Sequence, residues 1–266
     1  MVAVELSDIV VRPGGGDTIT DREGRQVAVL AERKDISITW YRLGPGEEGP
    51  DPHVHREHTD AFYVLEGRLG FALGPERKRI QVGAGGLVAA PPNVVHTFVN
   101  DSGAEARFLN LHAPDGGFAA YMRGVRDGDT EATFDTFDPP AGGGLPLSAA
   151  IVVDTGQGER LERGNRIATL KGVLPDLCVA EFEFDGPVEG PHLHSHDAQV
   201  DSFYVLEGEL EMTVDESRHR AGPDTLASIP RGIAHTFAHR AAGKARVLNL
   251  HAPDGGFGEF LRSVSS

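Results

Sequence analysis

Histidines recur in this sequence with a spacing that suits metal binding. The chain has 12 histidines among 266 residues. Two clusters share one order, which is a His-X-His pair, then an aspartate, then a more distant histidine. The first cluster contains His53, His55, Asp60 and His96, and the second contains His194, His196, Asp201 and His235.

Residue spacing explains how such a cluster would bind an ion. Residues i and i+2 of a β-strand point to the same face, so a His-X-His pair aims two imidazoles into one space. A third imidazole and a carboxylate would complete a mixed nitrogen and oxygen site. Without thiolate ligands, this set suits a divalent Fe, Mn, Ni, Co or Zn ion, and we expect about one ion in each cluster. The alternative, a group of structural histidines at a barrel mouth, is disfavoured because the whole order occurs twice.

The second cluster offers two overlapping His-X-His pairs, because His192 precedes His194 by two residues. The tripeptide EGP at 48–50 recurs at 189–191, and DAFYVLEG at 60–67 recurs as DSFYVLEG at 201–208. Both recurrences have the offset 141. This register aligns His196 with His55 and places His192 opposite Asp51. The sequence therefore predicts His196, not His192, as a ligand.

The elements that would position these side chains also occur twice. FLNLHAPDGGF at 108–118 recurs as VLNLHAPDGGF at 247–257 with the offset 139, so the second copy lacks two residues, which we place at a hairpin tip. We expect an N-terminal domain at 1–130 and a C-terminal domain at 147–266. The segment 131–146 between them is rich in Gly and Pro, and predicts a linker.

Each copy consists of short apolar runs bounded by turns, in a chain with 34 Gly and 17 Pro residues. This pattern is typical of an all-β sandwich or small barrel. Each copy then ends with apolar residues at helical spacing, which predicts a short C-terminal helix that packs on the barrel. Those residues are Phe118, Tyr121, Met122 and Val125 in one copy and Phe257, Phe260, Leu261 and Val264 in the other.

The two copies resemble cupin domains. The segment GPDPHVHREHTDAFYVLEG is similar to the first cupin motif, and GGLVAAPPNVVHTFVN and DTLASIPRGIAHTFAH are similar to the second. The resemblance implies a bicupin with two tandem double-stranded β-helix (jelly-roll) barrels. The chain departs from the family where Asp60 and Asp201 replace its glutamate. Because aspartate is one methylene shorter, each either binds the metal directly or orients a metal-bound water.

The FYVLEG and HTF segments are similar to those of quercetin dioxygenase-like bicupins. This resemblance implies a metal-dependent dioxygenase that cleaves an enolic or aromatic hydroxy-ketone (flavonol-like) substrate. Asp60 and Asp201 would be the catalytic proton acceptors. Two alternatives stay open: a metal-dependent isomerase or sugar-modifying cupin, and a non-catalytic metal- or ligand-binding bicupin.

Other polar and aromatic residues follow the motifs on the same strands. We expect Asn110 with His112, and Asn249 with His251, to share one face of the last strand. They would either face the pocket as supports of the ligands or, as we favour, have a hydrogen-bonded structural role beside the following turn. We expect core packing, rather than pocket lining, for four phenylalanines that lie close to the ligands in the sequence. They are Phe62, Phe98, Phe203 and Phe237.

Composition limits the partners that the chain can have. Its net charge of −15 disfavours nucleic acid. Cys178 is the only cysteine, which excludes an intrachain disulfide. The start, MVAVELSDIV, lacks the basic residues of a signal peptide, and no apolar run is long enough to span a membrane. We expect a cytoplasmic homodimer that binds a small-molecule substrate and neither nucleic acid nor membrane.

Overall fold

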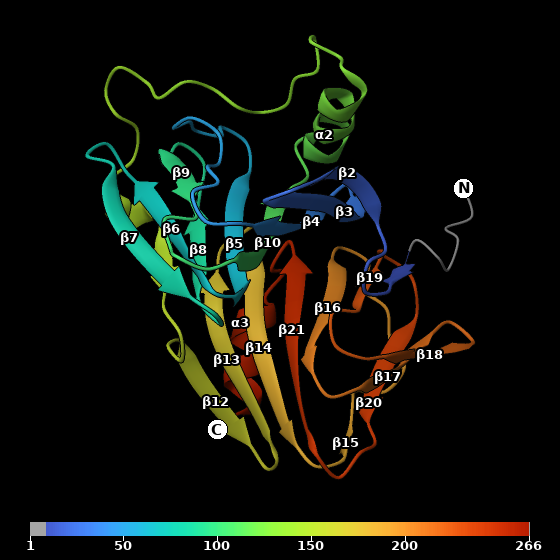
Figure 1. Ribbon diagram of the computed structural model, residues 1–266. Helices are drawn as coiled ribbons and strands as arrows, with labels where there is room; N and C mark the ends of the chain where they lie inside the picture. Colours follow the sequence, from blue (N-terminus) through green and yellow to red (C-terminus); the bar gives the residue numbers. More distant parts are fainter. Residues whose placement is uncertain (1–8, 266) are drawn as a thin grey trace. The chain divides into compact units, whose positions relative to one another are not determined.

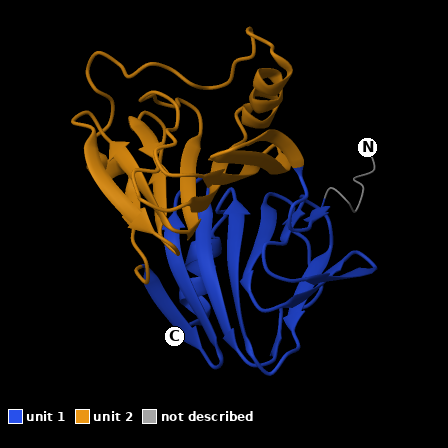
Figure 2. Ribbon diagram, in the orientation of Figure 1, with its two compact units in different colours: residues 1–16, 158–266 blue, residues 17–157 orange. Residues whose placement is uncertain are grey.

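Strands make up most of the computed structural model, which describes residues 9–265 (Figure 1). The acidic start of the chain, residues 1–8, lies outside the described residues. The chain divides into two compact units (Figure 2). We call residues 17–157 the N-terminal barrel, and residues 158–265 with residues 9–16 the C-terminal barrel. The predicted all-β fold with two repeats is confirmed.

The N-terminal barrel has a seven-stranded and a three-stranded sheet, both antiparallel. The large sheet has the order β11 (Ile151–Val153), β8 (Leu87–Ala90), β5 (Thr59–Glu66), β10 (Ala106–Ala113), β4 (Ile36–Leu43), β3 (Arg25–Arg33), β2 (Asp17–Arg22). The small sheet has the order β7 (Lys78–Gly83), β6 (Arg68–Leu73), β9 (His96–Val99). Helix α2 (Phe118–Asp127) and the 3-10 helix η1 (Leu147–Ala149) complete this unit.

The C-terminal barrel repeats this plan. Its large sheet has the order β1 (Val10–Val11), β19 (Leu226–Ile229), β16 (Val200–Glu207), β21 (Lys244–Ala252), β14 (Cys178–Asp185), β13 (Arg166–Val173), β12 (Glu159–Arg163). Its small sheet has the order β15 (Val188–Glu189), β20 (His235–His239), β17 (Leu210–Val214), β18 (Ser217–Ala221). Helix α3 (Phe257–Val264) follows β21.

One edge strand of each large sheet comes from outside the predicted domain boundaries. Strand β1 pairs with β19 of the C-terminal barrel, and β11 pairs with β8 of the N-terminal barrel. The units therefore differ from the predicted contiguous domains 1–130 and 147–266. The physical reason is that an edge strand joins whichever sheet offers unpaired backbone groups, and these pairings involve only two or three residues.

The predicted linker 131–146 packs on the N-terminal barrel, and we call it the crossover segment. Figure 1 shows it running from α2 across this unit. Phe137 and Val54 exchange backbone hydrogen bonds of 3.0 and 2.9 Å, and the Leu145 N–H donates to the Asn93 carbonyl at 2.8 Å. The segment lacks periodicity because it is anchored at separate points and forms no continuous strand.

Alternation along two neighbouring strands leads from the apolar core to the polar site in each barrel. On β10, Phe108, Asn110 and His112 share one face, and in register Asn110 lies opposite Phe62 and His112 opposite Asp60. Phe108 and Phe62 belong to the buried core. Strands β21 and β16 repeat this register through Asn249 and His251. The core therefore ends at the residues that form the site.

The repeats differ at the hairpin tip where two residues were predicted to be missing. Four residues join β6 to β7, and two residues join β17 to β18. Between β5 and β6, Gly67 has φ +75°, and a Cβ there would lie 2.3 Å from the Glu105 carbonyl oxygen. Gly208 repeats this geometry, so the glycine in each FYVLEG segment is required by the turn. Within residues 9–265, no helix is both long and apolar enough to cross a membrane.

Candidate metal centres

The structure brings together the four predicted residues of each cluster. In each set, one ligand atom per residue can be chosen so that these atoms all lie within 4.8 Å of one another. In the N-terminal barrel, His53 and His96 exchange backbone hydrogen bonds of 3.1 and 3.0 Å, which fixes the loop before β5 against β9. His194 and His235 form the same bridge in the C-terminal barrel. His192 is exposed and outside the set, as the register predicted.

Backbone carbonyls orient the imidazoles. Nδ1 of His53, His96, His194 and His235 each lies 2.9 Å from a carbonyl oxygen of the residue two positions earlier in the chain. A ring that donates its Nδ1 proton in this way leaves the Nε2 lone pair free for a metal. The ring orientation therefore exists before any ion binds.

Each aspartate divides its two oxygens between different partners. Oδ2 of Asp201 lies 3.1 Å from His235 Nε2 and 3.6 Å from His196 Nε2, on the ligand side. Oδ1 accepts a hydrogen bond of 2.6 Å from the amide of Asn249 and lies 3.3 Å from His251 Nε2. One oxygen thus stands among the ligands while the other is fixed from behind.

The N-terminal site has the same division. Asp60 Oδ2 lies 3.2 Å from His96 Nε2 and 3.6 Å from His55 Nε2, and the Asn110 amide donates to Oδ1. This geometry favours direct binding of each aspartate to an ion through Oδ2. It also corrects the expectation of structural roles for Asn110 and Asn249, because each amide contacts the carboxylate of its site.

The donor set fits a divalent transition metal. His55 Nε2 and His196 Nε2 are buried and have no hydrogen-bond partner within the described residues. A buried polar atom without a partner costs about 1–3 kcal/mol, which an ion at the centre of each cluster would offset. Three imidazoles and one carboxylate, without sulfur, are ligands for Fe, Mn, Ni, Co or Zn.

The crossover segment covers the N-terminal site. The Asp135 carboxylate accepts hydrogen bonds from the backbone N–H groups of Arg56 and Glu57, the latter at 2.7 Å, and its Oδ2 lies 2.8 Å from His58 Nδ1. These donors lower the pKa of Asp135 although burial opposes them. The Asp135 carbonyl also accepts a hydrogen bond from His55 Nδ1. This segment therefore orients one ligand of the site.

His58 forms a third histidine cluster beneath this cover. His55, His58 and His112 offer nitrogen atoms within 4.8 Å of one another, and the rings of His55 and His58 stack at 4.0 Å. His55 belongs to two sets and has one nitrogen held by Asp135, so the two sets cannot both bind an ion through it. The corresponding residue of the second repeat is Gln199, whose amide donates to the Asp254 carbonyl. One extra histidine, His58, therefore distinguishes the N-terminal site, because His55 and His112 have counterparts in His196 and His251.

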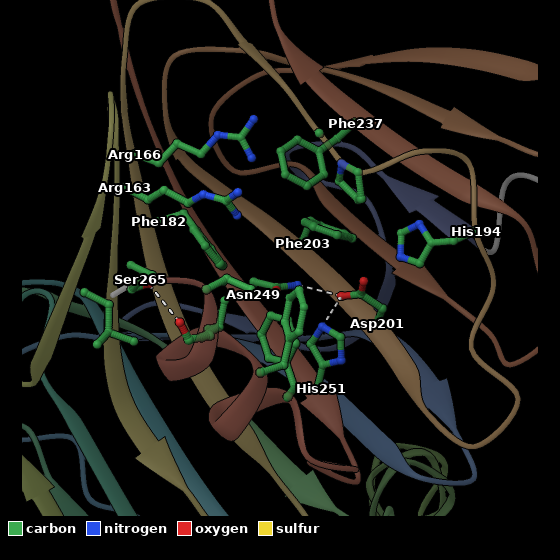
Figure 3. Close-up of a pocket in the computed structure, with 18 of the residues that line it drawn as sticks. Arg163, Arg166, Phe182, His194, Asp201, Phe203, Phe237, Asn249, His251 and Ser265 are labelled. Atoms are coloured by element: carbon green, nitrogen blue, oxygen red, sulfur yellow. Dashed lines mark hydrogen bonds and ion pairs between the residues drawn. The ribbon is translucent and has the colours of Figure 1, made fainter.

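The C-terminal site opens on a cavity of 780 Å³ (Figure 3). His194, His196 and Asp201 line one part of it. Aromatic and aliphatic side chains line much of the rest, and two arginines from the hairpin between β12 and β13 complete it. The apolar lining includes Leu161, Phe182, Phe203, Phe237, Phe257, Phe260, Leu261 and Val264, and the arginines are Arg163 and Arg166.

Helix α3 has a larger role than the packing that its sequence predicted. Phe257 stacks on His251 at 3.6 Å between ring centroids, and Phe260 lines the cavity while 55% exposed. The predicted core role of Phe203 and Phe237 needs the same correction, because both also line the cavity. Their counterparts Phe62 and Phe98 are buried in the core, as expected.

Electrostatics keep the aspartates ionised. Burial raises the pKa of Asp201, but the charge of His251, the nearby His196 imidazole and the hydrogen bond from His235 outweigh it, so the pKa falls well below its usual range. The pKa of Asp60 is lowered in the same way, with His112 as the main charge. Burial and the neighbouring His96 and His55 lower the pKa of His53 to about 4, so this imidazole is neutral at pH 7.

The fold and the sites define a class of protein with two all-β barrels, each with three histidines and an aspartate at the end of its core. The family model for the cupin domain matches residues 39–112 and 180–251. Together these segments span more than half of the chain and contain every predicted ligand. The chain belongs to the cupin family.

Two kinds of comparison place the chain among known proteins. It is 25% identical to the quercetin 2,3-dioxygenase of Bacillus subtilis over 255 residues, which covers 80% of this chain and 74% of that protein. Its fold is similar to a putative glyoxylate-induced protein of Pseudomonas aeruginosa, with a TM-score of 0.66, 16% identity and coverage of 91% and 87% of the two chains. It is also similar to the oxalate decarboxylase of Bacillus subtilis, with a TM-score of 0.65, 15% identity and coverage of 94% and 78%. At these identities the structural likeness shows the fold alone.

Proposed function

We propose that this protein is a metal-dependent dioxygenase that acts on an enolic or aromatic hydroxy-ketone substrate, with turnover at the C-terminal site. The observation that carries the proposal is a complete set of four ligands that opens on a cavity lined by aromatic side chains. Residue types at the site, its accessibility and the resemblance to a quercetin dioxygenase support the same reaction class.

His194, His196, His235 and Asp201 would hold the metal. A bound ion supplies Lewis acidity toward an enolate oxygen and, when redox-active, electron transfer with dioxygen. The protein residues fix the three imidazoles and keep the carboxylate in one orientation through Asn249.

Asp201 would accept the hydrogen bond of the substrate hydroxyl. Its lowered pKa keeps it ionised at neutral pH, so an acceptor oxygen is always present. Oδ1 is already bound by Asn249, which leaves Oδ2 as the oxygen that faces the ligands. The phenyl rings of Phe203 and Phe237 would exclude water from the side of the substrate that reacts.

Cavity size supports an aromatic substrate over a small diacid. Pockets for drug-sized molecules have volumes of about 300–1,000 Å³, and the cavity of 780 Å³ falls in this range. A two-carbon acid such as oxalate would leave most of the apolar lining exposed to water. The size of the cavity therefore favours a substrate like that of the quercetin dioxygenase over one like that of the oxalate decarboxylase.

The N-terminal site would hold an ion without turning over substrate. His55, Asp60 and His96 are each at most 3% exposed, and the crossover segment lies over them. We therefore assign the catalytic role to Asp201, and a metal-holding role to Asp60.

Oxygen consumption tests the proposal. The metal-loaded protein is mixed with the flavonol quercetin, and oxygen is measured with an electrode while the substrate absorbance is followed. Stoichiometric loss of oxygen and flavonol, abolished by Asp201→Asn, supports the dioxygenase. Turnover of an enol or sugar without oxygen uptake would instead indicate the isomerase. Tight flavonol binding without any turnover would indicate the binding protein, and either result would overturn the proposal.

A further inference from the structure

Two arginines of the cavity face each other without a carboxylate between them. Arg163 and Arg166 are directly opposed in the register of β12 and β13, on either side of the turn formed by Gly164 and Asn165. Side chains opposed in this way lie on the same face of a hairpin, and like charges there are destabilising. Among residues 9–265, neither guanidinium forms an ion pair with a carboxylate, and Arg166 donates a hydrogen bond to the Glu189 carbonyl.

The N-terminal barrel contains the same arginine pair with its carboxylate present. Arg22 and Arg25 precede Arg163 and Arg166 by 141 residues, and they oppose each other in the register of β2 and β3. Both bind Glu47. The Arg22 nitrogens lie 2.7 and 2.8 Å from the two Glu47 oxygens, and Arg25 Nε lies 2.9 Å from one of them. A second bond from Arg25 to the Glu48 carbonyl matches the bond from Arg166 to Glu189.

Val188 stands in the second repeat where Glu47 stands in the first. The backbone register is the same, because Asn100 N–H donates to the Glu47 carbonyl and Val188 pairs with His239 at the corresponding position. Val188 is buried in the core and offers no charge. The second repeat has thus kept both arginines and lost the carboxylate that they bind in the first.

The unpaired arginines point into the cavity. Figure 3 shows both guanidinium groups on one side of the pocket and His194 and Asp201 on the other. Burial and the charge of Arg163 lower the pKa of Arg166. In a chain with net charge −15, such a pair selects for an anionic group from outside the protein.

We infer that Arg163 and Arg166 bind a carboxylate of the substrate in the way that Arg22 and Arg25 bind Glu47. The substrate class is therefore an aromatic acid, with its carboxylate on the arginines, its ring among Phe182 and Phe203, and its enolic or phenolic oxygen toward Asp201. This inference rests on the proposed function for the reacting end of the substrate, and on the arginines alone for the carboxylate.

Binding measured without turnover tests the inference. The probes are naphthalene-2-carboxylate and its neutral counterpart naphthalene-2-carboxamide, titrated calorimetrically into metal-free protein under anaerobic conditions. We expect the carboxylate to bind at least about tenfold more tightly than the amide, since charge-assisted bidentate hydrogen bonds are strong. In the double variant Arg163→Gln/Arg166→Gln, this ratio should fall to about one. The matched control Arg22→Gln/Arg25→Gln should leave the ratio unchanged.

A second variant rebuilds the N-terminal arrangement in the C-terminal barrel. Val188→Glu places a carboxylate beside the arginines and should abolish the preference for the naphthoate, with folding checked by circular dichroism. A preference that survives in the arginine double variant would overturn the inference, and so would equal binding of the two probes to the unaltered protein. The binding measurement needs neither metal nor oxygen. Failure of the dioxygenase assay would therefore leave the carboxylate preference intact, and loss of the carboxylate preference would leave the dioxygenase proposal intact.

Discussion

His55 and His196 occupy the same position in the two repeats, yet their surroundings differ. The His55 side chain is 1% exposed, and its Nδ1 donates to the carbonyl of Asp135 in the crossover segment. The His196 side chain is 23% exposed and lines the cavity. The ligand motif fixes the position of each imidazole, whereas segments outside the motif determine access. One duplicated ligand set is therefore covered by a segment of the chain in one barrel and open to a cavity in the other.

Removal of the charge of each aspartate in turn should produce the largest difference between the two sites. Asp201→Asn should lower the rate of oxygen consumption by about 10²-fold or more, because it removes an anionic ligand and the hydrogen-bond acceptor of the substrate. Asp60→Asn should change the rate by less than about threefold, since Asp60 is buried and we assign turnover to the other site. Initial rates with an oxygen electrode measure both. Equal losses in the two variants would mean that both barrels turn over substrate.

The metal content of the protein should depend on one histidine of the PHLHSH segment and not on its neighbour. We expect about two ions per chain, one for each complete ligand set. His196→Ala should remove one of them, and His192→Ala should keep both, because His192 contributes only its backbone carbonyl to the orientation of His194. Elemental analysis after purification measures the stoichiometry. Loss of an ion in His192→Ala with retention in His196→Ala would contradict the register found here.

The crossover segment should slow the exit of the ion beneath it. Asp135→Ala removes acceptors for two backbone N–H groups and for His58, which should weaken the cover by about 1.5–3 kcal/mol. Loss of the N-terminal ion to a chelator should then be about tenfold faster or more. The C-terminal ion of the same protein serves as the internal control. Unchanged kinetics in Asp135→Ala would show that the segment does not limit access.

Acid should release the C-terminal ion first. Imidazole binds a metal only when neutral, so a higher histidine pKa means proton competition at a higher pH. Burial lowers the pKa of His235, but the hydrogen bond and charge of Asp201 outweigh it and the net pKa is raised. In the N-terminal site, burial and the neighbouring His96 lower the pKa of His53 to about 4, so protons compete for this ligand only at lower pH. Metal retained after dialysis at successive pH values measures the order, and the opposite order would contradict this expectation.

The ligand sets could be predicted because the same order of histidines and aspartate occurs in both repeats with matching spacing. The role of Asn110 and Asn249 was also readable, since each follows its apolar neighbour at a spacing of two on a strand that pairs with the ligand aspartate. The sequence alone favours a structural role instead, because an asparagine before a turn has an ordinary structural explanation. The ligands could be found from spacing, whereas their immediate supports needed the pairing of strands.

The cavity could not be predicted, because the sequence patterns of the elements that line it are those of ordinary packing elements. Helix α3 has the apolar spacing of any packing helix, although Phe260 faces the cavity. The crossover segment has no periodicity, and its contacts with Val54 and Asn93 follow from the tertiary fold. One signal was present in the sequence: Arg22 and Arg25 recur as Arg163 and Arg166, while Glu47 becomes Val188.

The exchange of edge strands has a consequence for the ancestry of this chain. The tripeptide Ile-Val-Val occurs at 9–11 and again at 151–153, at the start of each repeat, and each copy pairs with the barrel of the other repeat. In a single-repeat ancestor, a first strand that does not pair with its own barrel would pair with the sheet of a second molecule. The result would be a strand-swapped homodimer. Gene duplication would then have joined the two partners into one chain. A half-length gene product should accordingly dimerise or aggregate through the open edge at β8 or β19.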